Sequence, residues 1–155
     1  MDSYQQDIRG VMIAIANGSL LLPNASVAEV ITYSPPVTYD DVPDWVLGRL
    51  VWRGWQLPMF SFSTLVGLVD SETTDGAKIA VIKALNGNPK LPFMAMLTQG
   101  FPRLTTITPD TLEVSDDAEA PAEGIQSIVS VNEETAYIPD LDRIETLLCE
   151  AVYNE

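Results

Sequence analysis

The fold is decided by the stretch Gly48-Arg49-Leu50-Val51-Trp52-Arg53-Gly54-Trp55-Gln56-Leu57-Pro58-Met59-Phe60. β-Branched and aromatic residues lie on both sides of Gly54, and this pattern predicts two short strands joined by a glycine turn. Pro58 has no backbone N–H, so it restricts how the second strand can pair. We therefore expect a β-hairpin over this stretch.

The same hairpin combines large aromatic rings with positive charge. All three tryptophans of the chain, Trp45, Trp52 and Trp55, lie in it or beside it, together with Arg49 and Arg53. No acidic residue occurs between positions 45 and 69, although the formal net charge of the chain is -14. Arginine supplies oriented donors and tryptophan supplies contact area with little entropy to lose, so the hairpin is a candidate partner-binding surface. The alternative is that the tryptophans are buried and the arginines are merely solvated.

The totals favour one mainly β domain. The chain has 155 residues, of which 46% are hydrophobic, and its 9 glycines and 11 prolines punctuate short apolar runs. This length is typical of a single domain, here residues 1–155. No apolar run approaches the roughly 20 residues that a membrane-spanning helix needs, and no signal-peptide pattern opens the sequence. We expect a cytoplasmic protein, and its one cysteine, Cys149, cannot form an internal disulfide.

The charge excludes two classes of partner. Eight basic residues stand against 22 acidic ones, whereas nucleic acids and anionic membranes both require a cationic surface. The charge is also uneven, because residues 45–109 contain six basic and three acidic side chains. We expect one neutral-to-basic face on an otherwise acidic protein, an arrangement suited to docking between proteins.

Further elements follow from turn signals and periodicity. Asn17-Gly18 predicts a hairpin between residues 11–16 and 20–22, and Asn86-Gly87-Asn88 predicts a second between 78–85 and 91–97. A third joins residues 125–131 to 135–138, and single strands are expected at 30–33 and 101–108. Residues 44–47 read as one helical turn closed by Gly48. Residues 140–152 read as a helix with one apolar stripe.

Two loops are defined by composition. Residues 70–76 are polar and are expected to be solvated, whereas residues 61–68 fit either a strand end or a short helix. Residues 110–124 hold six acids and no base, and we expect a mobile acidic loop there. Its acids lack the spacing and central glycine of a calcium loop.

The residues that most enzymes use are missing. The chain has no histidine and one cysteine, which excludes histidine triads, histidine metal sites and thiolate cages. It contains no glycine-rich phosphate loop, and its acids concentrate in loops and at the ends, where burial cannot separate the pKa values of a catalytic pair. We expect no enzyme activity, no cofactor and no metal, which leaves a binding module.

Three segments carry a family resemblance. They are Val27-Ala28-Glu29-Val30, then Gly48 to Pro58, then Ala136-Tyr137-Ile138-Pro139-Asp140-Leu141-Asp142-Arg143-Ile144-Glu145. In order and spacing they resemble the CheW-like domain family of bacterial chemosensory adaptor proteins, over roughly residues 11–150. The most specific part is the spacing of Gly48, Arg53, Gly54 and Pro58.

The resemblance implies a fold and a role. The fold would be two intertwined five-stranded SH3-like barrels with an apolar groove between them and a C-terminal helix. The role would be a non-catalytic adaptor that links the cytoplasmic tips of methyl-accepting chemoreceptors to the regulatory domain of a CheA-type histidine kinase. Such an adaptor would be recruited to membrane receptor arrays through protein contacts, without inserting into the membrane.

The resemblance also implies site residues. Arg53 matches the arginine that faces the partners in the family, and Glu29, Gly48 and Gly54 match positions where partner coupling is sensitive. Trp52 and Trp55 replace smaller residues usual around the Arg-Gly pair, and this variant resembles the ChpC-type auxiliary adaptors of type IV pilus (twitching motility) systems. An alternative is a small-molecule binding domain in which Trp45, Trp52 and Trp55 line the groove between the subdomains.

Overall fold

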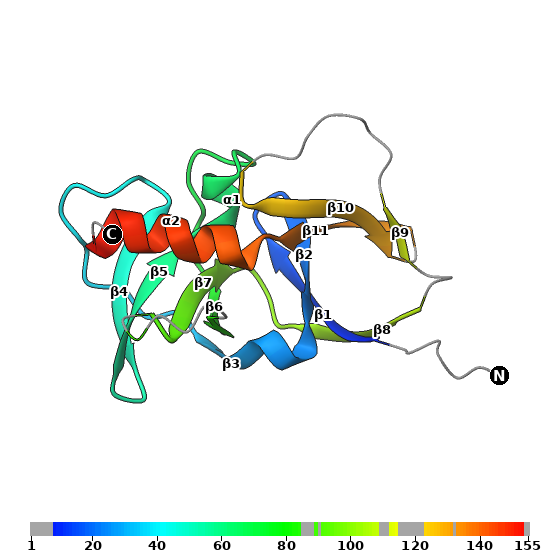
Figure 1. Cartoon of the computed structure of the whole chain (residues 1–155), viewed down its shortest axis with the longest axis horizontal. Coiled ribbons are helices and arrows are strands. Elements are labelled where there is room, and N and C mark those ends of the chain that lie inside the picture. Colours follow the sequence, from blue (N-terminus) through cyan, green and yellow to red (C-terminus); the bar gives the residue numbers. More distant parts are fainter. Residues whose placement is uncertain are drawn as a thin grey trace.

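Two sheets, interleaved along the chain, form the molecule (Figure 1). The computed structural model describes residues 8–84, 89, 91–108, 112–114, 123–131 and 133–153. The first sheet has the order β8-β1-β2-β11-β10-β9, with β1 (Ile8–Ile15), β2 (Gly18–Pro23), β8 (Arg103–Ile107), β9 (Leu112–Val114), β10 (Ile125–Val131) and β11 (Glu134–Pro139). The second has the order β3-β6-β7-β5-β4, with β3 (Val27–Thr32), β4 (Val46–Trp52), β5 (Trp55–Phe60), β6 (Lys78–Lys83) and β7 (Phe93–Thr98).

The predicted hairpins build both sheets. β1 pairs with β2, β4 with β5, β6 with β7 and β10 with β11, each antiparallel. The two ends of the chain make the first sheet and the middle makes the second, so the expected mainly β, intertwined architecture is confirmed. The first sheet gains a sixth strand because β9 forms within the expected acidic loop 110–124. Apart from β9 and residues 123–124, that loop lies outside the described residues.

Three hydrophobic clusters explain the packing. One belongs to the first sheet and includes Met12 and Val129, and another belongs to the second sheet and includes Leu57 and Ile79. The largest fills the space between the sheets and receives the stripe of helix α2 (Leu141–Tyr153), including Ile144 and the buried Cys149. Figure 1 shows α2 starting beside β11 of the first sheet and extending over the second sheet. The predicted C-terminal helix thus packs against the shared core of the two subdomains.

The helical turn expected at residues 44–47 is wrong. Val46 already begins β4, whose inward residues Val46, Leu50 and Trp52 are buried while Arg49 and Val51 are exposed. Burial of this alternating face outweighs the local helical signal. Gly48 lies beside a bulge inside the strand instead of capping a helix.

Two short helices and one loop connect the strands of the two sheets. Residues 61–68 contain α1 (Phe62–Leu65), which begins where the Ser61 hydroxyl accepts a hydrogen bond from the Thr64 N–H. The 3-10 helix η1 (Asn24–Ser26) leads into β3. The loop over residues 70–76 is exposed except at Glu72, which is partly buried.

Within the described part of the chain, no helix is long and apolar enough to cross a membrane.

Candidate functional site

Arg53 lies at the tip of the β4–β5 hairpin, in the two-residue turn between the paired Trp52 and Trp55. Both turn residues have positive φ, 50° for Arg53 and 82° for Gly54. Turns of this hand match the twist of the flanking strands, which is why a glycine is placed here. The β4–β5 hairpin extends beyond the other strands of the second sheet, with its tip at the lower left of Figure 1.

The Arg53 guanidinium is paired and still accessible. Its Nη2 donates to Glu29 Oε1 at 3.2 Å, and its Cζ lies 4.7 Å from the centre of the Trp52 ring. The side chain remains 68% exposed. Because a guanidinium has five N–H donors and the bond to Glu29 is its one hydrogen bond within the described residues, Arg53 keeps donors for a partner.

The three tryptophans have different surroundings. Trp52 is buried against Phe93, with ring centres 4.9 Å apart, and its Nε1 donates to Glu29 Oε1 at 2.8 Å. Trp55 lies 6.4 Å from the same Phe93 and is 46% exposed. Trp45 packs edge-on against Phe60 in the core between the sheets. Trp55 is therefore exposed, whereas Trp45 and Trp52 are packing residues, and partner binding by Trp55 stays a prediction. We call Glu29, Trp52, Arg53, Trp55 and Phe93 the hairpin site.

A shallow groove of about 300 Å³ adjoins the hairpin site along the outer face of β4. The segment between β3 and β4, which we call the crossing segment, crosses β4 at Val37. Val37 and Arg49 exchange backbone hydrogen bonds of 2.9 and 2.8 Å there. Val37 and Val51 are strongly exposed beside it. The groove is lined by Ile31, Ser34, Pro35, Val37, Arg49, Leu50, Val51 and Gln56.

Arg49 also faces an aromatic ring. Its Cζ lies 5.8 Å from the centre of the Tyr39 ring. Burial raises the pKa of the Tyr39 hydroxyl above its ordinary value, and Tyr153 adds to the effect while the positive charge of Arg49 opposes it. Arg49 thus lies at the junction of the groove and the crossing segment, as a neighbour of the hairpin site.

A second set of exposed apolar and basic residues lies in and around β8, with Lys78 supplied by β6 of the second sheet, and sequence reasoning missed it. Phe101 and Leu104 are 70% and 72% exposed. The Lys78 ammonium lies 4.9 Å from the centre of the Phe101 ring, and Arg9 lines a hollow with Leu104. We call these four residues the β8 patch. Lys78 and Phe101 are far apart in the sequence, so only their folded positions reveal it.

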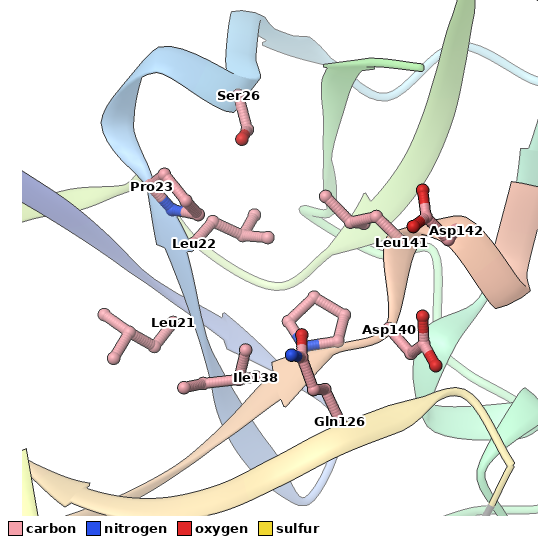
Figure 2. A pocket seen from close by; sticks show the side chains of 10 residues that line it. Leu21, Leu22, Pro23, Ser26, Gln126, Ile138, Asp140, Leu141 and Asp142 are labelled. Atoms are coloured by element: carbon pink, nitrogen blue, oxygen red, sulfur yellow. The ribbon is translucent and has the colours of Figure 1, made fainter. Parts of the chain in front are cut away.

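The cavity in Figure 2 has a different character. It measures about 290 Å³ and lies between β2, β11 and the start of α2, with Asp140 and Asp142 at its rim. None of the three tryptophans lines it, so this cavity is not the tryptophan-lined groove that the small-molecule alternative expects. Asp140 also caps α2, because its Oδ1 accepts a hydrogen bond from the Arg143 N–H at 3.1 Å.

Within the residues that the structure describes, no three histidine, cysteine, aspartate or glutamate side chains gather as metal ligands would. What the hairpin site offers is a cation beside exposed aromatic and aliphatic surface, which is suited to binding a protein.

The family is decided by a match over most of the chain. The family described as CheW-like domain matches residues 9–147. The chain belongs to the CheW-like domain family. Among solved structures, the scaffolding protein TtCheW from Thermoanaerobacter tengcongensis superposes with a TM-score of 0.72 at 13% identity, over 91% of this chain and 89% of that one. At this identity the likeness shows the CheW fold of two SH3-like subdomains. No curated protein sequence matches the chain.

Proposed function

We propose that this CheW-like protein is a non-catalytic adaptor that couples methyl-accepting chemoreceptors to a CheA-type histidine kinase. Family membership and the fold shared with TtCheW, which is a scaffolding protein, support the adaptor class. The observation that carries the contact is Arg53, which is held at a hairpin tip with 68% of its side chain exposed. A buried guanidinium with every donor used would have no contact to offer.

An adaptor needs two surfaces, and two sets of exposed residues with similar chemistry support this proposal. The hairpin site presents Arg53 and Trp55 from the second sheet, and the β8 patch presents Leu104 and Phe101 beside Arg9 of the first sheet and Lys78 of the second. Each combines exposed apolar area with positive charge in a chain of net charge -14. Different partners bound at the two surfaces would be held in a fixed relative orientation, so a shift of one is passed to the other.

A more specific proposal concerns the signalling system in which the adaptor acts. The tryptophans at 52 and 55 are the basis for proposing a ChpC-type adaptor of a type IV pilus system. That assignment requires binding to the pilus-type kinase in preference to the flagellar one. The place of action that we propose is the cytoplasmic side of membrane receptor arrays.

Co-sedimentation with arrays tests the proposal. Purified protein is mixed with receptor cytoplasmic fragments and the kinase regulatory domain from the same organism, and contacts of this class have affinities on the order of micromolar. Arg53→Glu and Leu104→Glu each change an exposed residue, so both variants should fold normally. We expect each to abolish recruitment into the three-component array, with affinity for one isolated partner reduced at least about thirtyfold.

The control is Arg143→Glu, which makes the same charge change as Arg53→Glu on α2, at a partly exposed residue paired with Glu123. Recruitment of this variant should match that of the unaltered protein. Unchanged co-sedimentation of Arg53→Glu would remove Arg53 from the contact surface. Failure of the unaltered protein to bind either partner would contradict the adaptor role itself.

A further inference from the structure

Trp52 belongs to a closed set of three contacts around the accessible arginine. A single oxygen, Glu29 Oε1, accepts hydrogen bonds from Trp52 Nε1 at 2.8 Å and from Arg53 Nη2 at 3.2 Å. The Arg53 Cζ in turn lies 4.7 Å from the centre of the Trp52 ring. Each member of the set thus touches both of the others.

The three side chains join the two edges of the second sheet. Glu29 comes from β3 and Trp52 from β4, which are the first and last strands in the order β3-β6-β7-β5-β4. No backbone ladder connects these two strands within the described residues. The Trp52–Glu29 bond therefore links the edges through side chains, and it does so directly beneath the hairpin tip.

The three side chains differ in how exposed they are and in how firmly their neighbours hold them. Trp52 is 8% exposed and fixed against Phe93, whereas the side chains of Glu29 and Arg53 are 40% and 68% exposed. An isolated exposed ion pair restrains its two side chains weakly. An indole N–H fixed in the core gives Glu29 an anchor that solvent cannot displace as readily, and its ring gives the guanidinium a face to stack on.

We infer that Trp52 is a positioning residue, which orients Arg53 for a partner by fixing Glu29 and by stacking under the guanidinium. This inference rests on the proposed function for its consequence, because an oriented arginine loses less entropy when it binds. The partner chemistry that fits is a carboxylate or carbonyl acceptor able to take the guanidinium donors that Glu29 leaves unused. Trp52 itself contacts no partner.

The decisive variant is Trp52→Phe. It keeps an aromatic ring against Phe93 but removes the indole N–H, so Glu29 loses its anchor. We expect the affinity for the partner that Arg53→Glu loses to fall about tenfold, the effect of one hydrogen bond to a charged group. Trp45→Phe is the matched control, because it also shortens a packed tryptophan but lies in the core between the sheets; its affinity should be unchanged.

A double-mutant cycle separates positioning from general packing. If Trp52 acts through Arg53, Trp52→Phe should cause no further loss of affinity in an Arg53→Ala background. An undiminished tenfold loss in that background would overturn the inference. Glu29→Ala, at a half-exposed residue, provides a second route should Trp52→Phe destabilise the protein, and the same lack of additivity with Arg53→Ala is expected.

A measurement without any partner keeps the inference distinct from the proposed function. Side-chain ¹⁵N relaxation of Arg53 Nε should report a restrained guanidinium in the unaltered protein and a faster one in Trp52→Phe and Glu29→Ala. Equal mobility in all three proteins would overturn positioning, even if Arg53→Glu abolished binding. Restraint by Trp52 together with absence of any partner binding would contradict the adaptor role alone.

Discussion

At the residue scale, the two glycines that the family resemblance placed in the site have backbone roles of different kinds. Gly48 has φ of +146°, and a Cβ there would lie 2.5 Å from the Val37 carbonyl oxygen. Gly54 has φ of +82° with no atom within 4 Å of its Cβ position. Gly48 is therefore required by a close approach of the crossing segment to β4, whereas Gly54 is required by the turn alone.

This difference predicts unequal stabilities. Gly48→Ala should lower the free energy of unfolding by about 3 kcal/mol, because a methyl group must displace the backbone at Val37. Gly54→Ala should cost about 1 kcal/mol, the ordinary penalty for a left-handed alanine. Urea unfolding measures both, and equal losses would contradict the steric account of Gly48.

The residue types of the hairpin site were predictable, but their contacts were not. The spacing of the hairpin residues predicted that Arg53 lies beside a turn glycine. The family resemblance, and not the spacing, identified Glu29. The bond between Glu29 and Trp52 joins strands at opposite ends of the sheet order, which no local pattern encodes. The exposure of Leu104 likewise depends on the position of β8 at the edge of the first sheet.

At the element scale, hairpins were predicted well because turn residues and alternation act locally. The two-residue turn of the first hairpin lies at Ala16 and Asn17, since Ile15 pairs with Gly18; it is one position earlier than Asn17-Gly18 suggested. The element that failed is the start of β4, where the crossing segment holds residue 37 against the strand. Pairing with a segment distant in the sequence decided its conformation.

The crossing segment should make the protein sensitive to alkali. Tyr39 packs against the core between the sheets, and its raised pKa means that the folded state favours the neutral hydroxyl. The neutral Tyr39 hydroxyl therefore contributes its full stabilisation of the folded state below about pH 10, the pKa of an unfolded tyrosine. This contribution is lost as the pH rises from there through the higher pKa of the folded state. Tyr39→Phe should lose less stability than the unaltered protein between about pH 9 and pH 11 in thermal unfolding. Identical alkaline losses in the two proteins would contradict this role.

At the scale of the whole molecule, one carboxylate ties the two sheets together at the loop that sequence reasoning expected to be solvated. Glu72 Oε1 accepts a hydrogen bond from the Ser61 hydroxyl at 2.6 Å, just after β5 of the second sheet. Its Oε2 accepts from the Ala16 N–H at 3.2 Å, in the β1–β2 turn of the first sheet, and from Gln99 Nε2 at 3.0 Å. An adaptor that passes a shift between partners needs such a fixed relation between its subdomains.

Removal of this carboxylate should loosen the junction between the sheets. Glu72→Ala leaves the fully buried Ser61 hydroxyl without its acceptor, so we expect a loss of about 2 kcal/mol in the free energy of unfolding. Amide hydrogen exchange at Ala16 should accelerate in the same variant, because its acceptor is gone. Asp70→Ala is the control, since it removes the same charge from an exposed position of the same loop and should change neither quantity. Equal effects of the two variants would mean that net charge, and not the link between the sheets, accounts for the loss.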